Sequence, residues 1–142
     1  MQKVLVVIDM QNDFVDGALG STQAQMIVDN VRKKIESFDG PIIFTRDTHG
    51  IDYLEHQEGK MLPVPHCVKN TEGWHIVKGL IEAAEGRPIM SPVSFIDKPN
   101  FGSFELLSRL EGMNSVNPIE SITLVGLCTD ICVVSNAIIL KA

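Results

Sequence analysis

Cys128 and Cys132 stand four residues apart in the segment Val125-Gly126-Leu127-Cys128-Thr129-Asp130-Ile131-Cys132, a pattern that predicts an apolar strand, a tight turn and a helix start. Thr129 or Asp130 is suited to cap that helix, which leaves Cys132 in its first turn. Unpaired backbone N–H groups and the helix dipole favour a thiolate over a thiol there. Cys132 is therefore a candidate nucleophile, with burial in a core as the structural alternative.

Two charged residues follow other apolar runs in the same way. Asp9 comes directly after residues 4–8, and Lys98 comes after residues 88–90 and a loop over residues 91–97. If the runs are neighbouring parallel strands, these side chains and Cys132 all emerge at the carboxyl ends, where open α/β sheets place their ligand crevice. Taken singly, a turn-capping Asp, a solvated Lys and a core Cys are ordinary structural residues. Their coincidence at three strand ends favours a shared site.

Size and composition limit the class of protein. With 142 residues the chain suits a single domain over residues 1–142, and its net charge of −6 comes with no dense basic patch. This charge distribution argues against nucleic acid or membrane as a partner and leaves a small molecule. Three cysteines without a CxxC pair fit reduced thiols, and the first apolar run is too short for a signal peptide. We expect a cytoplasmic protein.

Short β-branched runs alternate with amphipathic stretches along the chain, as βαβ units require. This alternation predicts a three-layer, doubly wound α/β fold with a mostly parallel sheet and helices on both faces. The expected strands are residues 3–8, 41–45, 88–90 and 122–125, and the expected helices are residues 22–38, 74–84, 102–110 and 130–141. The last helix is highly apolar and no strand follows it before Ala142, so we expect the domain to be truncated at its C-terminus.

Residues 46–72 form a long segment with no clear periodicity, and such loops in compact domains are usually functional. Asp47-Thr48-His49 places a carboxylate and an imidazole on one side of an extended segment, a donor pair suited to Zn²⁺, Mn²⁺ or Fe²⁺. Solvated surface side chains are the alternative. The candidate ligands of the segment are Asp47, His49, His56, Glu58 and His66.

Three separated motifs resemble the isochorismatase-like cysteine hydrolases, and among them the nicotinamidases. The motifs are Asp9-Met10-Gln11-Asn12-Asp13-Phe14, Lys98-Pro99-Asn100-Phe101-Gly102-Ser103-Phe104 and Gly126-Leu127-Cys128-Thr129-Asp130-Ile131-Cys132-Val133. The resemblance implies a catalytic triad of Asp9, Lys98 and Cys132. It also implies an oxyanion hole made by the backbone N–H groups of Cys128 and Cys132.

Each role in this triad has a physical reason. Cys132 has to lose its proton to attack an amide carbonyl, and Asp9 can take that proton and later return it to the departing ammonia. Lys98 would hold Asp9 in place and stabilise developing negative charge. The product of the attack would be a thioester at Cys132, which water then hydrolyses.

In nicotinamidases a metal in the loop after the second strand binds the pyridine nitrogen of the substrate. Asp47, His49 and His66 match that pattern, and the resemblance leaves the fourth ligand between Glu58 and His56, with a preference for Glu58. The cofactor it implies is a divalent transition metal, with Zn²⁺ first and Mn²⁺ or Fe²⁺ as alternatives.

The resemblance also places substrate-binding residues. Phe14 matches a ring that packs against the substrate, and Phe101 is a second candidate for the same wall. Residues 63–66 depart from the aromatic-Pro-Pro-His arrangement common in nicotinamidases, which places Leu62 or Pro63 where a pocket ring would stand. His75 and Cys67 lie off the motifs, and we assign them no role in the site.

The primary hypothesis is therefore hydrolysis of nicotinamide to nicotinate and ammonia through a cysteine thioester. A second hypothesis keeps the triad but takes another small amide or an N-carbamoyl or ureido compound, without metal. A third is a catalytically silent oligomeric binding module. Isochorismate hydrolysis is disfavoured because its vinyl-ether chemistry does not employ a cysteine. Members of the family generally self-associate, so we expect a homo-oligomer.

Overall fold

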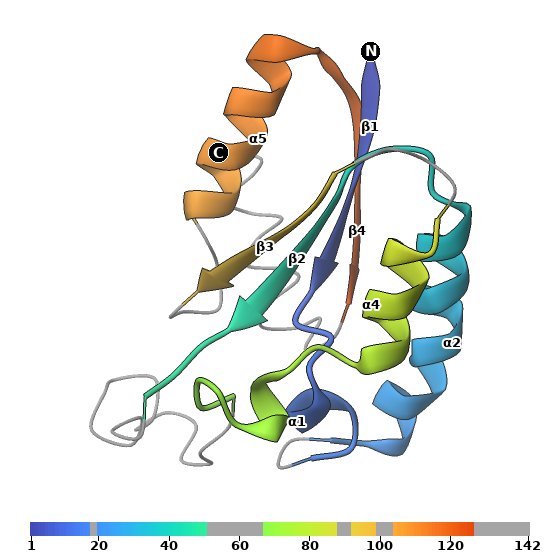
Figure 1. The fold of residues 1–142 in the computed structure, drawn as a ribbon, viewed down its shortest axis with the longest axis vertical. Helices are drawn as coiled ribbons and strands as arrows, with labels where there is room; N and C mark the ends of the chain where they lie inside the picture. The colour runs from blue at the N-terminus through green and yellow to red at the C-terminus, as the bar shows by residue number, and fades with distance from the viewer. Residues whose placement is uncertain (18–19, 51–66, 88–91, 99–103, 127–142) are drawn as a thin grey trace.

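Four parallel strands form the centre of the protein, described here from a computed structural model (Figure 1). The structure describes residues 1–17, 20–50, 67–87, 92–98 and 104–126. The strands are β1 (Gln2–Ile8), β2 (Ile42–Asp47), β3 (Val93–Lys98) and β4 (Ile119–Gly126), in the spatial order β3-β2-β1-β4. The other elements are the helices α1 (Asn12–Val15), α2 (Thr22–Ser37), α4 (Lys78–Glu85) and α5 (Phe104–Val116) and the 3-10 turn η2 (Glu72–Trp74).

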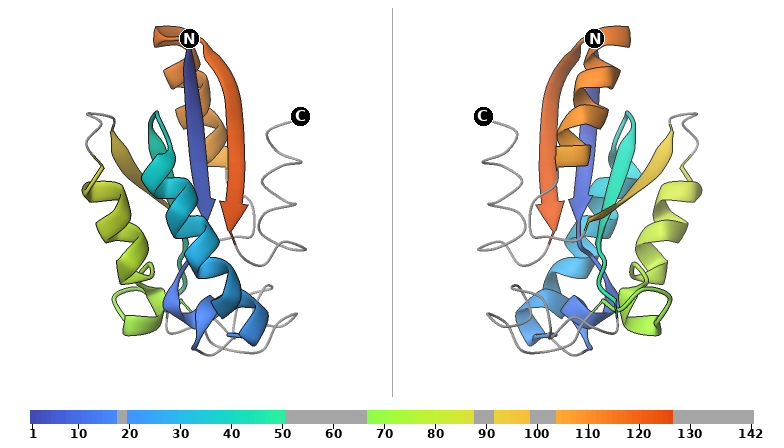
Figure 2. Two further views of the ribbon diagram at one scale, coloured as in Figure 1. Left: turned by 90° about the vertical axis from the view of Figure 1, so that its right-hand side faces the viewer. Right: turned by 90° about the vertical axis from the view of Figure 1, so that its left-hand side faces the viewer.

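Helices cover both faces of the sheet, as Figures 1 and 2 show: α2 and α4 lie on one face and α5 lies on the other. The chain begins in β1, winds outward to β2 and β3, and then returns to pair β4 with β1 on the other side. This arrangement confirms the predicted doubly wound, parallel α/β fold. The four described strands are all parallel, so their carboxyl ends meet at one edge of the sheet.

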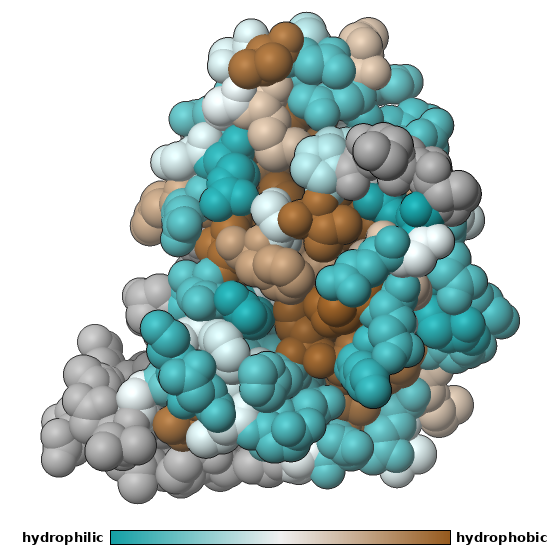
Figure 3. Space-filling model, in the orientation of Figure 1, coloured by the Kyte–Doolittle hydropathy of each residue, from teal (hydrophilic) through white to brown (hydrophobic). Residues whose placement is uncertain are grey.

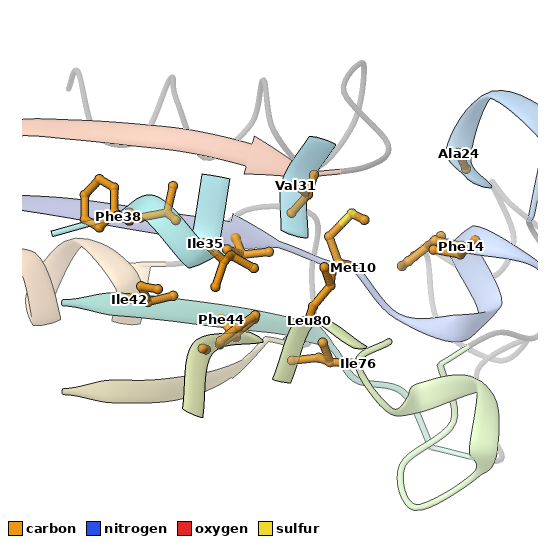
Figure 4. Close-up of a cluster of buried hydrophobic side chains, with 14 of the residues drawn as sticks. Met10, Phe14, Ala24, Val31, Ile35, Phe38, Ile42, Phe44, Ile76 and Leu80 are labelled. Carbon is orange, nitrogen blue, oxygen red and sulfur yellow. The ribbon is translucent and has the colours of Figure 1, made fainter. Parts of the chain in front are cut away.

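The core consists of two apolar layers, one on each side of β1. Residues 4–8 are all fully buried, because a central strand covered on both faces needs no polar alternation. Toward α2 and α4, the side chains of Ile35, Phe44 and Leu80 belong to one cluster (Figure 4). Toward α5, the side chain of Leu106 packs with those of the opposite layer, which includes Val6 and Ile8.

A buried arginine closes the end of the sheet opposite to the carboxyl ends of the strands. The guanidinium of Arg87 donates hydrogen bonds to the carbonyl oxygens of Phe38 (3.0 Å), Gly40 (2.8 Å) and Ala84 (3.3 Å). Burial lowers the pKa of Arg87 from its ordinary value, and the charge of Asp39 partly opposes this. Arg87 therefore ties the segment before β2 to the end of α4.

The surface seen in Figure 3 is largely polar, with apolar side chains gathered between α4 and α5. Phe95 of the edge strand β3 is 39% exposed, and its ring stacks on that of Phe44 with 5.5 Å between the centroids. Among the described residues, no helix combines the length and the apolar character needed to cross a membrane.

The third strand was predicted in the wrong place. Residues 93–98 form β3, where we expected a loop, and residues 88–91 lie outside the described part of the chain. The reason is that β3 is an edge strand and is only partly buried, so it lacks the continuous apolar run of a central strand. Lys98 is consequently the last residue of a strand.

Other boundaries differ by less. The predicted helix over residues 74–84 is split, because the N–H of Val77 donates to the carbonyl of Met10 (2.9 Å) and Ile76 pairs with Gln11, which keeps this stretch extended before α4. Helix α5 runs past the exposed Gly112, where we had expected it to end at Leu110. The strands β1, β2 and β4 and the helix α2 coincide with predicted elements at slightly shifted ends, and the helix predicted over residues 130–141 lies outside the described residues.

The glycine at the end of β4 allows two main chains to approach closely. Gly126 has a φ of +146°, and a Cβ built at this position would lie 2.1 Å from the carbonyl oxygen of Ile8. Only glycine therefore lets β4 end beside the residue that precedes Asp9.

We expect Gly126→Ala to lower the free energy of unfolding by about 1–3 kcal/mol, because the new Cβ meets backbone and the φ is strained for an L side chain. The matched control is Gly112→Ala in α5, where a Cβ meets nothing within 4 Å. That change should raise the free energy of unfolding by about 0.5–1 kcal/mol, since alanine is the better helix former. Urea denaturation measures both, and equal effects of the two substitutions would contradict this reading.

Candidate active site

A buried ion pair lies at the carboxyl ends of the strands. Nζ of Lys98, the last residue of β3, is 2.8 Å from Oδ2 of Asp9, which directly follows β1. The side chain of Lys98 is 1% exposed and that of Asp9 is 0% exposed. The two strands are not neighbours, because β2 runs between them. The structure thus brings together two of the three residues predicted for the triad.

The strand between them contributes a third group, which the sequence analysis missed. Thr45 of β2 donates a hydrogen bond from Oγ1 to Oδ1 of Asp9 (2.8 Å). The N–H of Asp9 in turn lies 3.2 Å from both the carbonyl oxygen and Oγ1 of Thr45. Asp9 adopts a φ of +52°, in the left-handed region that few residues other than glycine enter and that aspartate enters more readily than most. Contacts to two other strands thus fix the orientation of its carboxylate.

Each charge of the Asp9–Lys98 pair depends on the other for its stability in the buried site. A single charge buried this deeply is costly, whereas an opposite charge within hydrogen-bonding distance offsets much of the desolvation penalty. The ammonium of Lys98 and the hydroxyl of Thr45 both stabilise the ionised carboxylate of Asp9. An ionised carboxylate is a proton acceptor, which is the chemistry that this arrangement offers.

A second pair of polar side chains lies at the end of β2. Oδ2 of Asp47 and Nε2 of His49 are 2.9 Å apart, with Asp47 fully buried and His49 9% exposed. Asp47 is in register with Lys98, so both side chains project from the same face of the sheet. The main chain of His49 is held by Cys67 and Lys69: its N–H donates to the carbonyl of Cys67 (3.0 Å), and its carbonyl accepts from the N–H of Lys69 (2.9 Å).

The donor set of this pair fits a transition metal. A carboxylate oxygen and an imidazole nitrogen that lie 2.9 Å apart are ligands that Zn²⁺ accepts, and their low exposure limits competition from water. Within the described part of the chain, no group of three or more His, Cys, Asp and Glu side chains is placed to hold a metal ion. The other predicted ligands, His56, Glu58 and His66, lie outside the described residues.

The remaining predicted residues fall into two groups. Phe14 lies in α1 and is 4% exposed, in the apolar cluster that Figure 4 shows, so its contact with a substrate stays a prediction. The thiol-bearing residue Cys67 is fully buried, and its N–H donates to Oδ2 of Asp13 (2.8 Å). The predicted residues outside the described part of the chain are Leu62, Phe101, Cys128 and Cys132.

Comparison with known proteins identifies the class. The sequence model of the isochorismatase domain matches residues 3–141, so the chain belongs to the isochorismatase family. The similar solved structures include a nicotinamidase/pyrazinamidase, PncA from Bacillus subtilis, with 32% identity, coverage of 97% of this chain and 78% of that one, and a TM-score of 0.77.

Two further similar structures are an amidase with a different substrate and a pyrazinamidase with bound zinc. N-carbamoylsarcosine amidase from Thermoplasma acidophilum is 26% identical, with coverage of 97% of this chain and 75% of that chain and a TM-score of 0.75. A pyrazinamidase of Pyrococcus horikoshii in complex with zinc is 26% identical, with coverage of 99% and 79% and a TM-score of 0.72. A metal is therefore present in at least one relative of similar fold.

The buried pair predicts a stability effect. Lys98→Met should lower the free energy of unfolding by about 3–5 kcal/mol, because it leaves the Asp9 carboxylate buried without its counter-charge. Adding Asp9→Asn to Lys98→Met should recover part of this loss, since the charge that needed compensation is then gone. Urea denaturation at neutral pH measures both.

The control is Lys78→Met. In the wild type, Nζ of Lys78 lies 3.7 Å from the carboxylate of Glu82 at the surface, and the two side chains are 90% and 64% exposed. This pair is solvated, so its loss should change stability little. A Lys98→Met protein as stable as the Lys78→Met protein would show that the Asp9–Lys98 pair does not stabilise the fold.

Proposed function

We propose that the protein is an amidohydrolase that converts nicotinamide to nicotinate and ammonia through a thioester on Cys132. The observation that carries the proposal is the buried Asp9–Lys98 pair at the carboxyl ends of the strands, with Thr45 orienting the carboxylate. Relatives named as nicotinamidases and as an amidase support amide hydrolysis as the reaction class. The choice of nicotinamide rests on the motif resemblance together with the Asp47–His49 pair.

The proposed reaction has two halves. In the first, Asp9 accepts the proton of the Cys132 thiol while the sulfur attacks the amide carbonyl, and the backbone N–H groups of Cys128 and Cys132 stabilise the oxyanion. The C–N bond then breaks, and the departing ammonia takes the proton from Asp9. In the second half, Asp9 accepts a proton from water, which attacks the thioester and releases nicotinate, and the proton returns to the thiol.

Lys98 keeps its charge throughout this cycle. When Asp9 carries the proton, the ammonium favours its release, because the ionised carboxylate is the form that the ion pair stabilises. Thr45 keeps Oδ1 occupied, so that the proton exchanges at a carboxylate held in one orientation.

The proposed metal ligands are Asp47, His49, His66 and Glu58, with His56 as the alternative to Glu58. A bound Zn²⁺ would supply a Lewis acid that accepts the ring nitrogen of the substrate, and Mn²⁺ or Fe²⁺ would do the same. By holding the metal, these side chains would orient the amide of the substrate toward Cys132. This orientation lowers the entropic part of the activation free energy for attack by the thiol.

A second candidate function is hydrolysis of an N-carbamoyl compound on the same triad. It is favoured by the similarity to N-carbamoylsarcosine amidase. The two substrates differ in that only nicotinamide offers a ring nitrogen for a metal.

Ammonia release from nicotinamide and from N-carbamoylsarcosine, measured side by side, tests the proposal. The wild type should act on nicotinamide, and Cys132→Ala should lose at least about 10³-fold in kcat, because the covalent route is gone. Cys67→Ala is the matched control, since it removes a different thiol, which is buried, and should retain activity. Equal rates for wild type and Cys132→Ala would reject the thiol mechanism, and release from N-carbamoylsarcosine alone would select the second candidate.

Metal removal tests the anchor separately from the triad. Dialysis against a chelator should raise KM for nicotinamide strongly, because the ring loses its anchor, and Zn²⁺ added back should restore it. Steady-state kinetics before and after chelation measure this. Unchanged KM and kcat in metal-free protein would remove the metal from the proposal while leaving the triad in place.

A further inference from the structure

Gln11 is fully buried and lies between the two parts of the site, the Asp9–Lys98 pair and the Asp47–His49 pair. It follows Asp9 by two residues and its own N–H donates to the carbonyl of Asp9 (2.8 Å). The hydrogen bonds of its side chain go to the main chains of Asp47 and Trp74, on the metal side of the site. The side chain of Gln11 is therefore bound to the segment that carries Asp47.

The amide of Gln11 binds the main chain of Asp47 at two points. Oε1 accepts a hydrogen bond from the N–H of Asp47 (2.9 Å), and Nε2 donates to the carbonyl oxygen of Asp47 (2.9 Å). Nε2 also donates to the carbonyl oxygen of Trp74 (2.8 Å). A two-point contact fixes both the position and the tilt of a peptide segment, because neither group can rotate without losing one bond.

Trp74 also holds this segment. Its ring nitrogen Nε1 donates to Oγ1 of Thr48 (3.0 Å), and the guanidinium of Arg46 lies 4.3 Å from the centroid of its ring. The short stretch that carries Asp47 and His49 is thus fixed to Gln11 directly and through Trp74. This network ties the segment after β2 to the bend after β1.

We infer that Gln11 is a positioning residue for the metal anchor, which sets the place of Asp47 and His49 relative to Asp9. This inference rests on the metal-binding part of the proposed function. Removing the amide leaves the N–H and carbonyl of Asp47 and the carbonyl of Trp74 without their side-chain partner in a buried environment, so the segment has to shift to find new ones. Outer-shell groups of this kind change metal affinity about 10–100-fold when they are lost.

The test compares two buried clamps at opposite ends of the sheet. Gln11→Leu removes three hydrogen bonds to backbone groups beside the site, and Arg87→Met removes three at the far end. Zn²⁺ affinity of metal-free full-length protein is measured by competition with a chromogenic chelator, with circular dichroism to verify folding. Peptide-resolved alkylation of Cys132 by iodoacetamide reports on the triad independently of the metal.

Gln11→Leu should weaken Zn²⁺ binding about 10–100-fold. Arg87→Met should leave it within about twofold of wild type, because distant sites act independently. Alkylation of Cys132 should stay within about twofold of wild type in Arg87→Met for the same reason, and in Gln11→Leu because the side-chain hydrogen bonds that are lost go to the main chains of Asp47 and Trp74. The inference is overturned if folded Gln11→Leu binds Zn²⁺ as tightly as wild type, if Arg87→Met weakens binding equally, or if the wild type binds no Zn²⁺.

Gln11→Glu provides a second measurement if Gln11→Leu does not fold. This change preserves the side-chain volume and the acceptor for the N–H of Asp47, but the new side chain cannot donate to the carbonyls of both Asp47 and Trp74. Zn²⁺ affinity should therefore fall again. A Gln11→Glu protein that binds Zn²⁺ as tightly as the wild type would overturn the inference. A wild type that binds Zn²⁺ but releases no ammonia from nicotinamide refutes the proposed function alone, and reduced affinity in the Gln11 variant then still supports the positioning role. Active wild type with unchanged Zn²⁺ affinity in the variant refutes the positioning role alone.

Discussion

The buried contact between Asp9 and Lys98 constrains the whole sheet. Its two charges come from strands separated by β2, so the 2.8 Å contact exists only while three strands keep their register. A slip of one residue would turn Lys98 to the opposite face, because side chains alternate along a strand. The apolar layers under α2, α4 and α5 hold that register and exclude water from the pair. Packing and chemistry therefore depend on the same alignment.

The fold could be predicted because β1 is central. Its run of buried aliphatic residues and the alternation with amphipathic segments are visible in the sequence. The edge strand β3 could not be placed in the same way, since Ser94, Asp97 and Lys98 interrupt its apolar character. Lys98 was still identified as a site residue, because the resemblance depends on the motif that begins with it. The error in the strand therefore did not affect the choice of Lys98.

The supporting residues of the site could not be found from local pattern. Thr45 reads as an ordinary β-branched strand residue, and its partner Asp9 is 36 residues away. Gln11 belongs to a quoted motif, yet the groups it binds on Asp47 and Trp74 become neighbours only after the sheet has formed. The Asp47–His49 pair was accessible to prediction because its two residues are nearly adjacent in the chain. Sequence reasoning therefore reaches reactive groups and local pairs more readily than the contacts that orient them.

The mutual dependence of Asp9 and Lys98 has a consequence for descendants of this protein. Under relaxed selection, a surface-exposed reactive side chain can be replaced freely, but replacing either member of a buried charge pair first costs several kcal/mol of stability. A lineage that has abandoned turnover would therefore retain both side chains as a relic of its architecture. The presence of Asp9 and Lys98 together in a homologue is therefore evidence of an inherited scaffold. Only a cysteine at the position of Cys132 would indicate that the catalytic activity has been kept.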